Sequence, residues 1–206
     1  MSKRNVIFIL LILFSITGIF TYFQSLPSLL EKKPSLITGK ILVRPMEIDN
    51  FELIDQNNEA FNKKRLEGGW TVLFFGYTNC PDVCPTTIYK LAEIKNGIKE
   101  DLPSANFNTV LVTLDPDRDS AERLDEYIGY FDETMLGVTG TYENIQSFTS
   151  SLSVFYQRIN KEEGYDFNHT ASIFVFDKDG SLFATMSPAN TVGELESDFF
   201  TILNNF

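Results

Sequence analysis

The stretch WTVLFFGYTNCPDVCPTTIYK, residues 70–90, decides the fold that we predict for this chain. An apolar run from Trp70 to Phe75 ends in a glycine, and the only two cysteines of the chain follow it, Cys80 and Cys84, each with a proline directly after it. A continuous apolar run of this length is typical of a strand that is buried on both faces. From Pro85 onward, apolar residues recur at helical spacing. We therefore predict a buried strand, a short loop and a helix, with two thiols at the junction between loop and helix.

The two cysteines suit redox chemistry or metal binding better than they suit a structural disulfide. A disulfide between residues four apart closes so short a loop that its entropic gain is small. If Cys84 and Pro85 begin the helix, the positive end of the helix dipole stabilises a thiolate there, although Asp82 opposes this effect. Redox enzymes usually have two residues between such cysteines. The three residues found here predict a looser loop that can hold a metal ion between the sulfurs.

His169 is the only histidine of the chain, and it lies in the sequence NHTASIFVF just before an apolar strand. Taken alone, a histidine at a strand entrance is more often a surface or capping residue than a ligand. In the predicted fold, however, the loop before this strand faces the helix that carries the cysteines. Two thiolates and one imidazole make a three-coordinate site that suits copper, because thiolates select Cu(I) and imidazole accommodates Cu(I) and Cu(II). A structural zinc ion normally needs a fourth strong ligand, and none is evident.

The remaining pattern predicts an α/β fold, with a central mixed sheet flanked by helices. The strand–loop–helix start with its two cysteines and the ββα finish resemble a thioredoxin-like fold. Asp179-Gly180 predicts a hairpin turn, Thr191 to Glu194 predicts a capping box, and either Asp119 or Ser120 can cap a helix. We predict strands at 70–77, 109–114, 136–138, 154–159, 171–176 and 182–186, a short hairpin at 51–61, and helices at 85–99, 121–131, 142–152 and after 191.

An uncharged apolar run from Val6 to Phe23 follows Lys3 and Arg4. As a helix of 1.5 Å rise it spans roughly 27 Å, which is close to the thickness of a bilayer core, and its basic end is expected to stay cytoplasmic. A cleaved signal peptide is the alternative, but no small-residue cleavage site follows the run. In either case the cysteines lie outside the cytosol.

From these patterns we predict four segments. They are a cytoplasmic tail (1–5), a transmembrane anchor (6–23), a proline-containing linker with little fixed structure (24–46) and a folded domain (47–206). The apolar segment lacks the Arg-rich and Ser-rich character of a transit peptide. We therefore expect a single-pass protein of the bacterial inner membrane with its C-terminal domain in the periplasm.

The composition is acidic, with 28 Asp and Glu against 17 Lys and Arg, and a net charge of −11. Such a surface repels phosphates, which makes nucleic acid an unfavourable partner and favours cations or basic proteins. The aromatic fraction of 14% and hydrophobic fraction of 43% fit a folded domain.

Three motifs carry a family resemblance: FGYTNCPDVCP, LVTLDPDRDSAERL and NHTASIFVFDKDGSL, in this order and spacing. Together they resemble the Sco/SenC family of copper-binding assembly factors, from about Phe51 to the C-terminus. The resemblance implies a thioredoxin-like metallochaperone that helps to assemble the binuclear copper centre of cytochrome c oxidase. It implies one copper ion, Cu(I) or Cu(II), bound by Cys80, Cys84 and His169. It also implies three protein partners: an upstream copper donor, a thiol reductant and the oxidase's copper-centre subunit.

Two points stay open at the level of sequence. The motif from Asp115 to Asp119 follows a strand end, so Asp115 and Arg118 either form a solvated turn or orient the copper loop and contact a partner. Two other functions also compete with the metallochaperone. One is a thiol–disulfide oxidoreductase that uses a redox-active Cys80–Cys84 disulfide to reduce a partner's cysteines, and the other is a thiol peroxidase. His169 distinguishes the metallochaperone from the oxidoreductase, because a plain dithiol reductase does not need a histidine there.

Overall fold

A computed structural model of the chain describes residues 12–22, 34–103, 105 and 107–206. The chain divides into two compact units, residues 1–34 and residues 35–206. In the first unit, residues 12–22 are helical. The rest of the predicted anchor, 6–11 and 23, lies outside the described residues. Within the described part of the chain, no helix combines the length and the apolar character needed to cross a membrane. The anchor and the periplasmic location therefore stay predictions.

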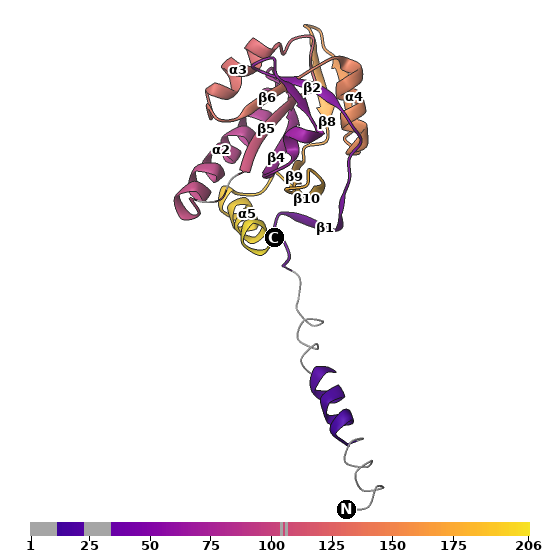
Figure 1. Ribbon diagram of the computed structural model, residues 1–206. Helices are drawn as coiled ribbons and strands as arrows, with labels where there is room; N and C mark the ends of the chain where they lie inside the picture. Colours follow the sequence, from indigo (N-terminus) through magenta and orange to yellow (C-terminus); the bar gives the residue numbers. More distant parts are fainter. Residues whose placement is uncertain (1–11, 23–33, 104, 106) are drawn as a thin grey trace, which may run out of the picture. The chain divides into compact units, whose positions relative to one another are not determined.

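An eight-stranded mixed sheet forms the centre of the second unit (Figure 1). Its strand order is β1-β10-β9-β4-β5-β6-β2-β3; β4, β5 and β6 are parallel, and the other neighbours pair antiparallel. The bounds are β1 Gly39–Met46, β2 Glu52–Asp55, β3 Ala60–Asn62, β4 Trp70–Gly76, β5 Phe107–Thr113, β6 Leu136–Thr139, β9 Ile173–Phe176 and β10 Leu182–Met186. A mixed sheet between helices confirms the predicted α/β class.

The helices cover both faces of this sheet (Figure 1). One face packs against α2 (Val83–Asp101), α3 (Ala121–Gly129) and α5 (Val192–Asn205), and the other packs against α4 (Tyr142–Ser151) and the short 3-10 helix η1 (Lys63–Leu66). The capping box that we predicted from Thr191 to Glu194 opens α5. Ser120 caps α3 by accepting a hydrogen bond from the Arg123 amide, so Asp119 is free for another role.

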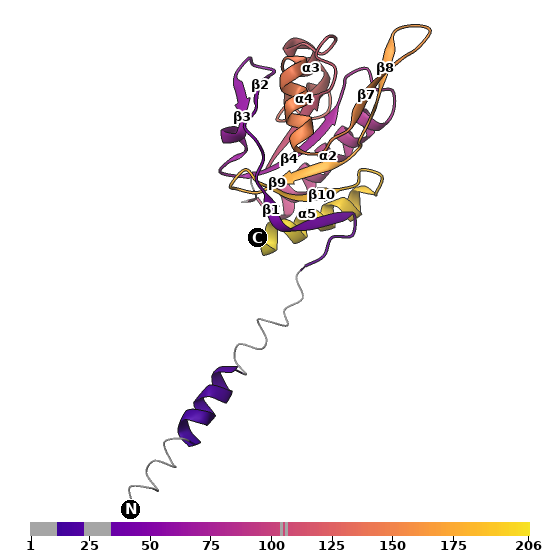
Figure 2. The same cartoon turned by 90° about the vertical axis from the view of Figure 1, so that its right-hand side faces the viewer.

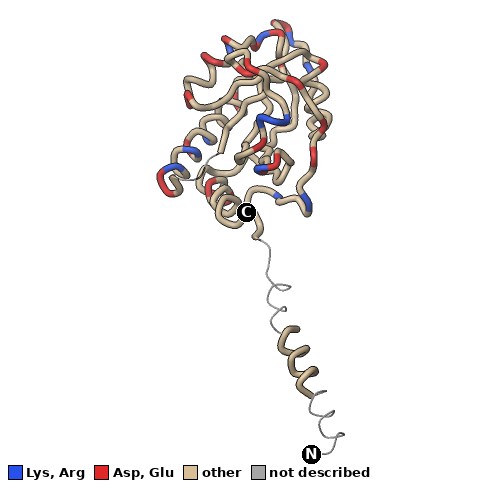
Figure 3. Tube along the Cα trace, viewed as in Figure 1, with Lys and Arg blue, Asp and Glu red and all other residues tan. Residues whose placement is uncertain are grey.

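Strand β4 is buried along its whole length, as its continuous apolar run predicts. Val72 and Phe74 point into the core under α2, α3 and α5, whereas Leu73 and Phe75 point into the core under α4. The three inner strands β4, β5 and β9 contain no charged residue, and the Asp, Glu, Lys and Arg side chains lie on the outer elements (Figure 3). β4 thus lies at the apolar centre of the sheet, and the loop with Cys80 extends from its end.

Strand β1 corrects the predicted linker. We expected little fixed structure over residues 24–46, but Gly39–Met46 pairs with β10 at the edge of the sheet. The buried carboxylate of Asp198 on α5 fixes the beginning of this strand. It accepts hydrogen bonds from the backbone amides of Ile37 and Thr38, at 2.7 and 2.6 Å, and from the Thr38 hydroxyl at 2.6 Å. Asp198 thus binds the two residues directly before β1, which lie 160 and 161 positions away in sequence, and local patterning does not reveal this contact.

A second correction concerns the segment before β9. The sequence predicted one strand at 154–159, and the structure has a two-stranded hairpin, β7 (Tyr156–Asn160) and β8 (Tyr165–His169), that pairs with no strand of the eight-stranded sheet. Figure 2 shows this hairpin extending from the domain beside α2 and α4. His169 is therefore the last residue of a strand, not a residue of a loop.

We predict that Asp198→Ala lowers the free energy of unfolding by about 2–3 kcal/mol, because it leaves buried amide donors at the start of β1 without an acceptor. Urea unfolding of the full chain measures this change, and hydrogen exchange at the Thr38 amide locates it. Ser197→Ala, an exposed neighbour on the same helix, is the matched control. Equal unfolding midpoints for the two variants would contradict the role assigned to Asp198.

Candidate metal centre

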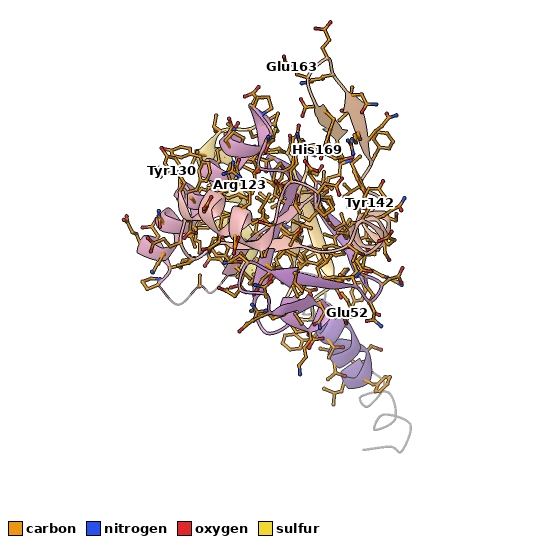
Figure 4. All side chains as sticks on the ribbon, turned by 90° about the horizontal axis from the view of Figure 1, so that it is seen from above. Glu52, Arg123, Tyr130, Tyr142, Glu163 and His169 are labelled. Atoms are coloured by element: carbon orange, nitrogen blue, oxygen red, sulfur yellow. The ribbon has the colours of Figure 1, made fainter. Side chains whose placement is uncertain are left out.

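The fold brings the two cysteines and the histidine together from three segments. Cys80 lies in the loop after β4, Cys84 is the second residue of α2, and His169 ends β8. The antiparallel pairing of β4 with β9 places Phe74 opposite Ile173, so the chain leaving β4 and the chain entering β9 lie at the same edge of the sheet. Figure 4 shows His169 at the inner end of the hairpin, whose outer tip carries Glu163. The sequence-based prediction that this segment faces the cysteines follows from this register.

The three side chains contact one another. The distance from Cys84 Sγ to His169 Nε2 is 3.9 Å, and Cys80 lies close enough to both side chains for each to lower its pKa. Both cysteines are free thiols; Cys84 is buried and Cys80 is half-buried. Among the described residues, no three His, Cys, Asp or Glu side chains already stand in the arrangement that holds a metal ion. The donors are thus adjacent, without being preformed into a closed site.

The hydrogen bonding of His169 identifies which ring nitrogen is available. Nδ1 lies 3.1 Å from the carbonyl oxygen of Thr170. A carbonyl oxygen only accepts hydrogen bonds, so Nδ1 carries the proton in the neutral ring and Nε2 keeps its lone pair. Nε2 is the nitrogen that faces Cys84. The backbone therefore sets the tautomer that a metal ligand needs, as outer partners of ligating histidines commonly do.

The two cysteine side chains have opposite shifts in pKa, so that one of them holds a proton and the other does not. The pKa of Cys80 is lowered to about 3, chiefly by the interaction with the Cys84 thiol and less by the neighbouring His169 ring, against the opposing effect of burial. The pKa of Cys84 is raised, because its proton is held in the hydrogen bond to Cys80 and its sulfur is buried. At neutral pH, the half-buried Cys80 is therefore the thiolate and the buried Cys84 is the thiol.

Gly76 gives the Cys84 sulfur its space at the end of β4. A Cβ atom at this position would lie 2.9 Å from Cys84 Sγ and 3.1 Å from the Phe74 ring. Real Cβ atoms do not approach other atoms so closely, so any larger residue here would displace the sulfur or the ring. The glycine that ends the apolar run in sequence is thus part of the floor of the site.

Asp119 holds the loop that carries Cys80. Its buried carboxylate accepts hydrogen bonds from the Thr78 amide at 3.0 Å, the Thr78 hydroxyl at 2.7 Å and the Thr113 hydroxyl at 2.6 Å. Sequence reasoning considered Asp119 only as a helix cap. The one signal that pointed elsewhere was Ser120 beside it, an equally good cap that makes a second one unnecessary.

Asp115 and Arg118, which we predicted as possible loop or partner contacts, contact the hairpin that carries His169. Asp115 is buried; it forms an ion pair with Arg118 and accepts a hydrogen bond of 2.8 Å from the Tyr165 hydroxyl.

A second link joins Tyr77, three residues before Cys80, to the hairpin, because the Tyr77 hydroxyl donates a hydrogen bond to Asp166. Sequence reasoning missed Tyr77, Tyr165 and Asp166, since nothing in the pattern revealed β8.

The donor set fits copper. It consists of a thiolate, a second thiol and an imidazole nitrogen with a free lone pair, which are the soft and intermediate ligands that copper takes. Cys80 and His169 are both partly exposed, so either can be reached from solvent. The buried Cys84 would complete the site once it has lost its proton.

Comparison with known proteins gives consistent matches over most of the chain. The family model described as SCO1/SenC matches residues 43–204. A SCO2-like protein of Rickettsia felis is 31% identical over 184 residues, which cover 86% of this chain and 88% of the relative. Copper-bound ScoI of Arabidopsis thaliana is 28% identical, with a TM-score of 0.74 over 77% of this chain and 99% of that one. Copper-bound ScoI of Bradyrhizobium japonicum is 32% identical, with a TM-score of 0.67 over 74% and 97% of the two chains.

We predict that Cys80 of the reduced, metal-free protein reacts with iodoacetamide before Cys84 does, at a rate that is nearly constant from about pH 5 to pH 8. An ordinary thiol of pKa about 8.5 slows roughly tenfold for each pH unit below that value, because only the thiolate reacts. Mass spectrometry of the alkylated peptides gives both rates.

Cys84→Ala is the matched control for this measurement, because it removes the largest cause of the lowered Cys80 pKa. In this variant the alkylation rate of Cys80 should fall with decreasing pH. Faster alkylation of Cys84 than of Cys80 in the parent protein would contradict the assignment of thiolate and thiol.

Proposed function

The chain belongs to the SCO1/SenC family, and from that premise we propose that it is a copper metallochaperone that binds one copper ion through Cys80, Cys84 and His169. Related ScoI structures contain copper, which supports the choice of metal. The observation that carries the proposal is the lone pair of His169 Nε2, which faces Cys84 at 3.9 Å beside the Cys80 thiolate. A disulfide reductase has no need of an imidazole in that position.

We further propose that copper enters and leaves by exchange of one ligand at a time. Cys80 is partly exposed and is the thiolate, so it can attach copper first, while His169 and the buried Cys84 complete the site. Release reverses these steps. It can begin because a three-coordinate site leaves room for an incoming thiolate or imidazole of another protein. The proposed acceptor is the copper-centre subunit of cytochrome c oxidase, and an upstream donor and a thiol reductant complete the cycle.

A second candidate function is thiol–disulfide exchange. The lowered pKa of Cys80 and its partial exposure favour it, because the thiolate is the form that attacks a disulfide. In this reaction the Cys80 thiolate would attack a partner disulfide and form a mixed disulfide with one partner sulfur, releasing the other. Cys84, after losing its proton, would then attack Cys80 Sγ, form the Cys80–Cys84 disulfide and displace the remaining partner sulfur. The partner leaves with two reduced sulfurs. Reduction of the oxidase's cysteines in this way would precede their metallation.

We predict that His169→Ala weakens Cu(II) binding by more than about a hundredfold, because an inner ligand is lost where even outer partners contribute 10–100-fold. Cu(I) binding falls less, since two thiolates remain, and the Cys80–Cys84 disulfide still forms on oxidation. Titration of the reduced full chain with each ion measures the affinities. Asn168→Ala, an exposed neighbour on β8, is the control. Parental Cu(II) affinity in His169→Ala would refute the ligand assignment.

We also predict that the oxidised protein binds little copper, because a disulfide offers no thiolate. Metal analysis after incubation with Cu(I) or Cu(II) should give about one copper per reduced chain and far less per oxidised chain. Full loading of the disulfide form would disprove this dependence on redox state. Rapid exchange with a dithiol, without tight copper binding in the reduced form, would favour the second candidate function.

A further inference from the structure

The β4–β9 register brings the end of β8 to the cysteines, but no hydrogen bond of the eight-stranded sheet holds His169 itself. β8 pairs only with β7, and this two-stranded sheet joins no strand of the eight-stranded sheet. Isolated two-stranded hairpins are marginally stable in water. The residues that hold the hairpin against the domain therefore decide where the imidazole lies relative to the two sulfurs.

Tyr165, at the other end of β8, has the most extensive of these contacts. The guanidinium carbon of Arg118 lies 3.8 Å from the centre of its ring, and that of Arg158 lies 3.4 Å from the same point. Two guanidinium groups this close to one ring centre would overlap on a single face, so they occupy opposite faces. Arg118 follows β5 and Arg158 lies on β7, and the ring of Tyr165 is thus held between the domain and its own hairpin.

Hydrogen bonds and an ion pair complete this arrangement. The Tyr165 hydroxyl donates to buried Asp115 at 2.8 Å, and Arg118 Nη1 donates to the Tyr165 carbonyl oxygen at 3.1 Å. Arg118 also pairs with Asp115, and Arg158 pairs with Asp117 at 3.7 Å. Backbone, hydroxyl and ring of this one tyrosine are therefore all held by the loop from Asp115 to Arg118.

The contact at Tyr165 extends to His169 along β8. Alternate residues of a strand share a face, and Tyr165, Phe167 and His169 are such a series. The ring centres of Tyr165 and Phe167 lie 5.8 Å apart. Tyr77 packs against Phe167 and His169. Its ring centre lies 5.3 Å from that of Phe167 and 6.1 Å from that of His169. A displacement of Tyr165 is thus transmitted through packed rings to the imidazole.

We propose that Tyr165 is a positioning residue for the metal centre: held between Arg118 and Arg158 and bonded to Asp115, it fixes the hairpin so that His169 Nε2 faces the cysteines. The part of this inference that concerns copper rests on the proposed function. The part that concerns the position of the imidazole does not, and it has its own readout. Cation–π contacts and hydrogen bonds of this kind contribute on the order of tenfold each to the equilibrium that they bias.

The first measurement uses the reduced, copper-free full chain. His169 is the only histidine, so its imidazole gives a single, assignable set of proton NMR signals. Tyr165→Ala should shift these signals toward those of a free imidazole, because the ring loses its fixed place beside Tyr77 and Cys84. Tyr165→Phe keeps the ring between the arginines and loses only the bond to Asp115, so a smaller shift is expected. Tyr130→Ala, an exposed tyrosine on the other side of the domain from the hairpin tip (Figure 4), is the control.

The second measurement is copper titration of the same variants. Tyr165→Ala should weaken Cu(II) binding by roughly tenfold or more and change Cu(I) binding by less than about threefold, because Cu(I) is held by the two thiolates. Unchanged His169 signals and unchanged Cu(II) affinity in Tyr165→Ala would overturn the proposal. If Tyr165→Ala does not fold, the same two measurements are made on Tyr165→Phe and Arg158→Gln. His169 signals and Cu(II) affinity like those of the parent in both variants would overturn the proposal. Absence of tight copper in the parent would instead refute the proposed function, while the NMR comparison still tests the positioning role.

Discussion

The metal centre depends on one constraint, the burial of β4 on both faces. Because side chains of β4 fill two separate cores, the strand cannot slide or turn without emptying both. Its antiparallel register with β9 then fixes where the chain enters β9, and its end at Gly76 fixes where the loop with Cys80 begins. The adjacency of sulfur and imidazole is a consequence of this central strand, since the ligands themselves lie in segments that the sheet does not contain.

The three donors are held with different rigidity. Cys84 lies on α2 above Gly76, and the loop with Cys80 is fastened through Thr78 to buried Asp119. His169 lies at the end of a hairpin that is fastened by partly exposed aromatic and ionic contacts. This division places the two sulfurs on a part of the domain that is held by buried contacts, and the imidazole on a hairpin that is held by side-chain contacts.

The sequence predicted those features that depend on local chemistry. The apolar run of β4, the turn at Gly180, the capping box at Thr191 and the juxtaposition of Cys80, Cys84 and His169 were all found as expected. It missed β1 and β8, because neither strand contains a buried residue and the apolar alternation of both is weak. The bond from Asp119 to the loop with Cys80 and the contact of Asp115 with Tyr165 were not specified either. A buried carboxylate is recognised by its partners, and those partners lie up to 50 residues away in sequence.

The arrangement around His169 favours metal binding over simple disulfide chemistry. Exchange of disulfides requires only the Cys80 thiolate and the Cys84 thiol, and both are fully specified by β4, α2 and Asp119. Yet the chain also holds an imidazole beside these sulfurs, with its tautomer set by the Thr170 carbonyl and its strand fastened by Tyr77 and by the contacts of Tyr165. A neutral histidine whose Nε2 lone pair is already turned toward sulfur lowers the cost of ligating a cation there, because its ring proton need not leave. A reductase would gain little from such preorganisation, whereas a site that alternates between accepting and releasing copper depends on it.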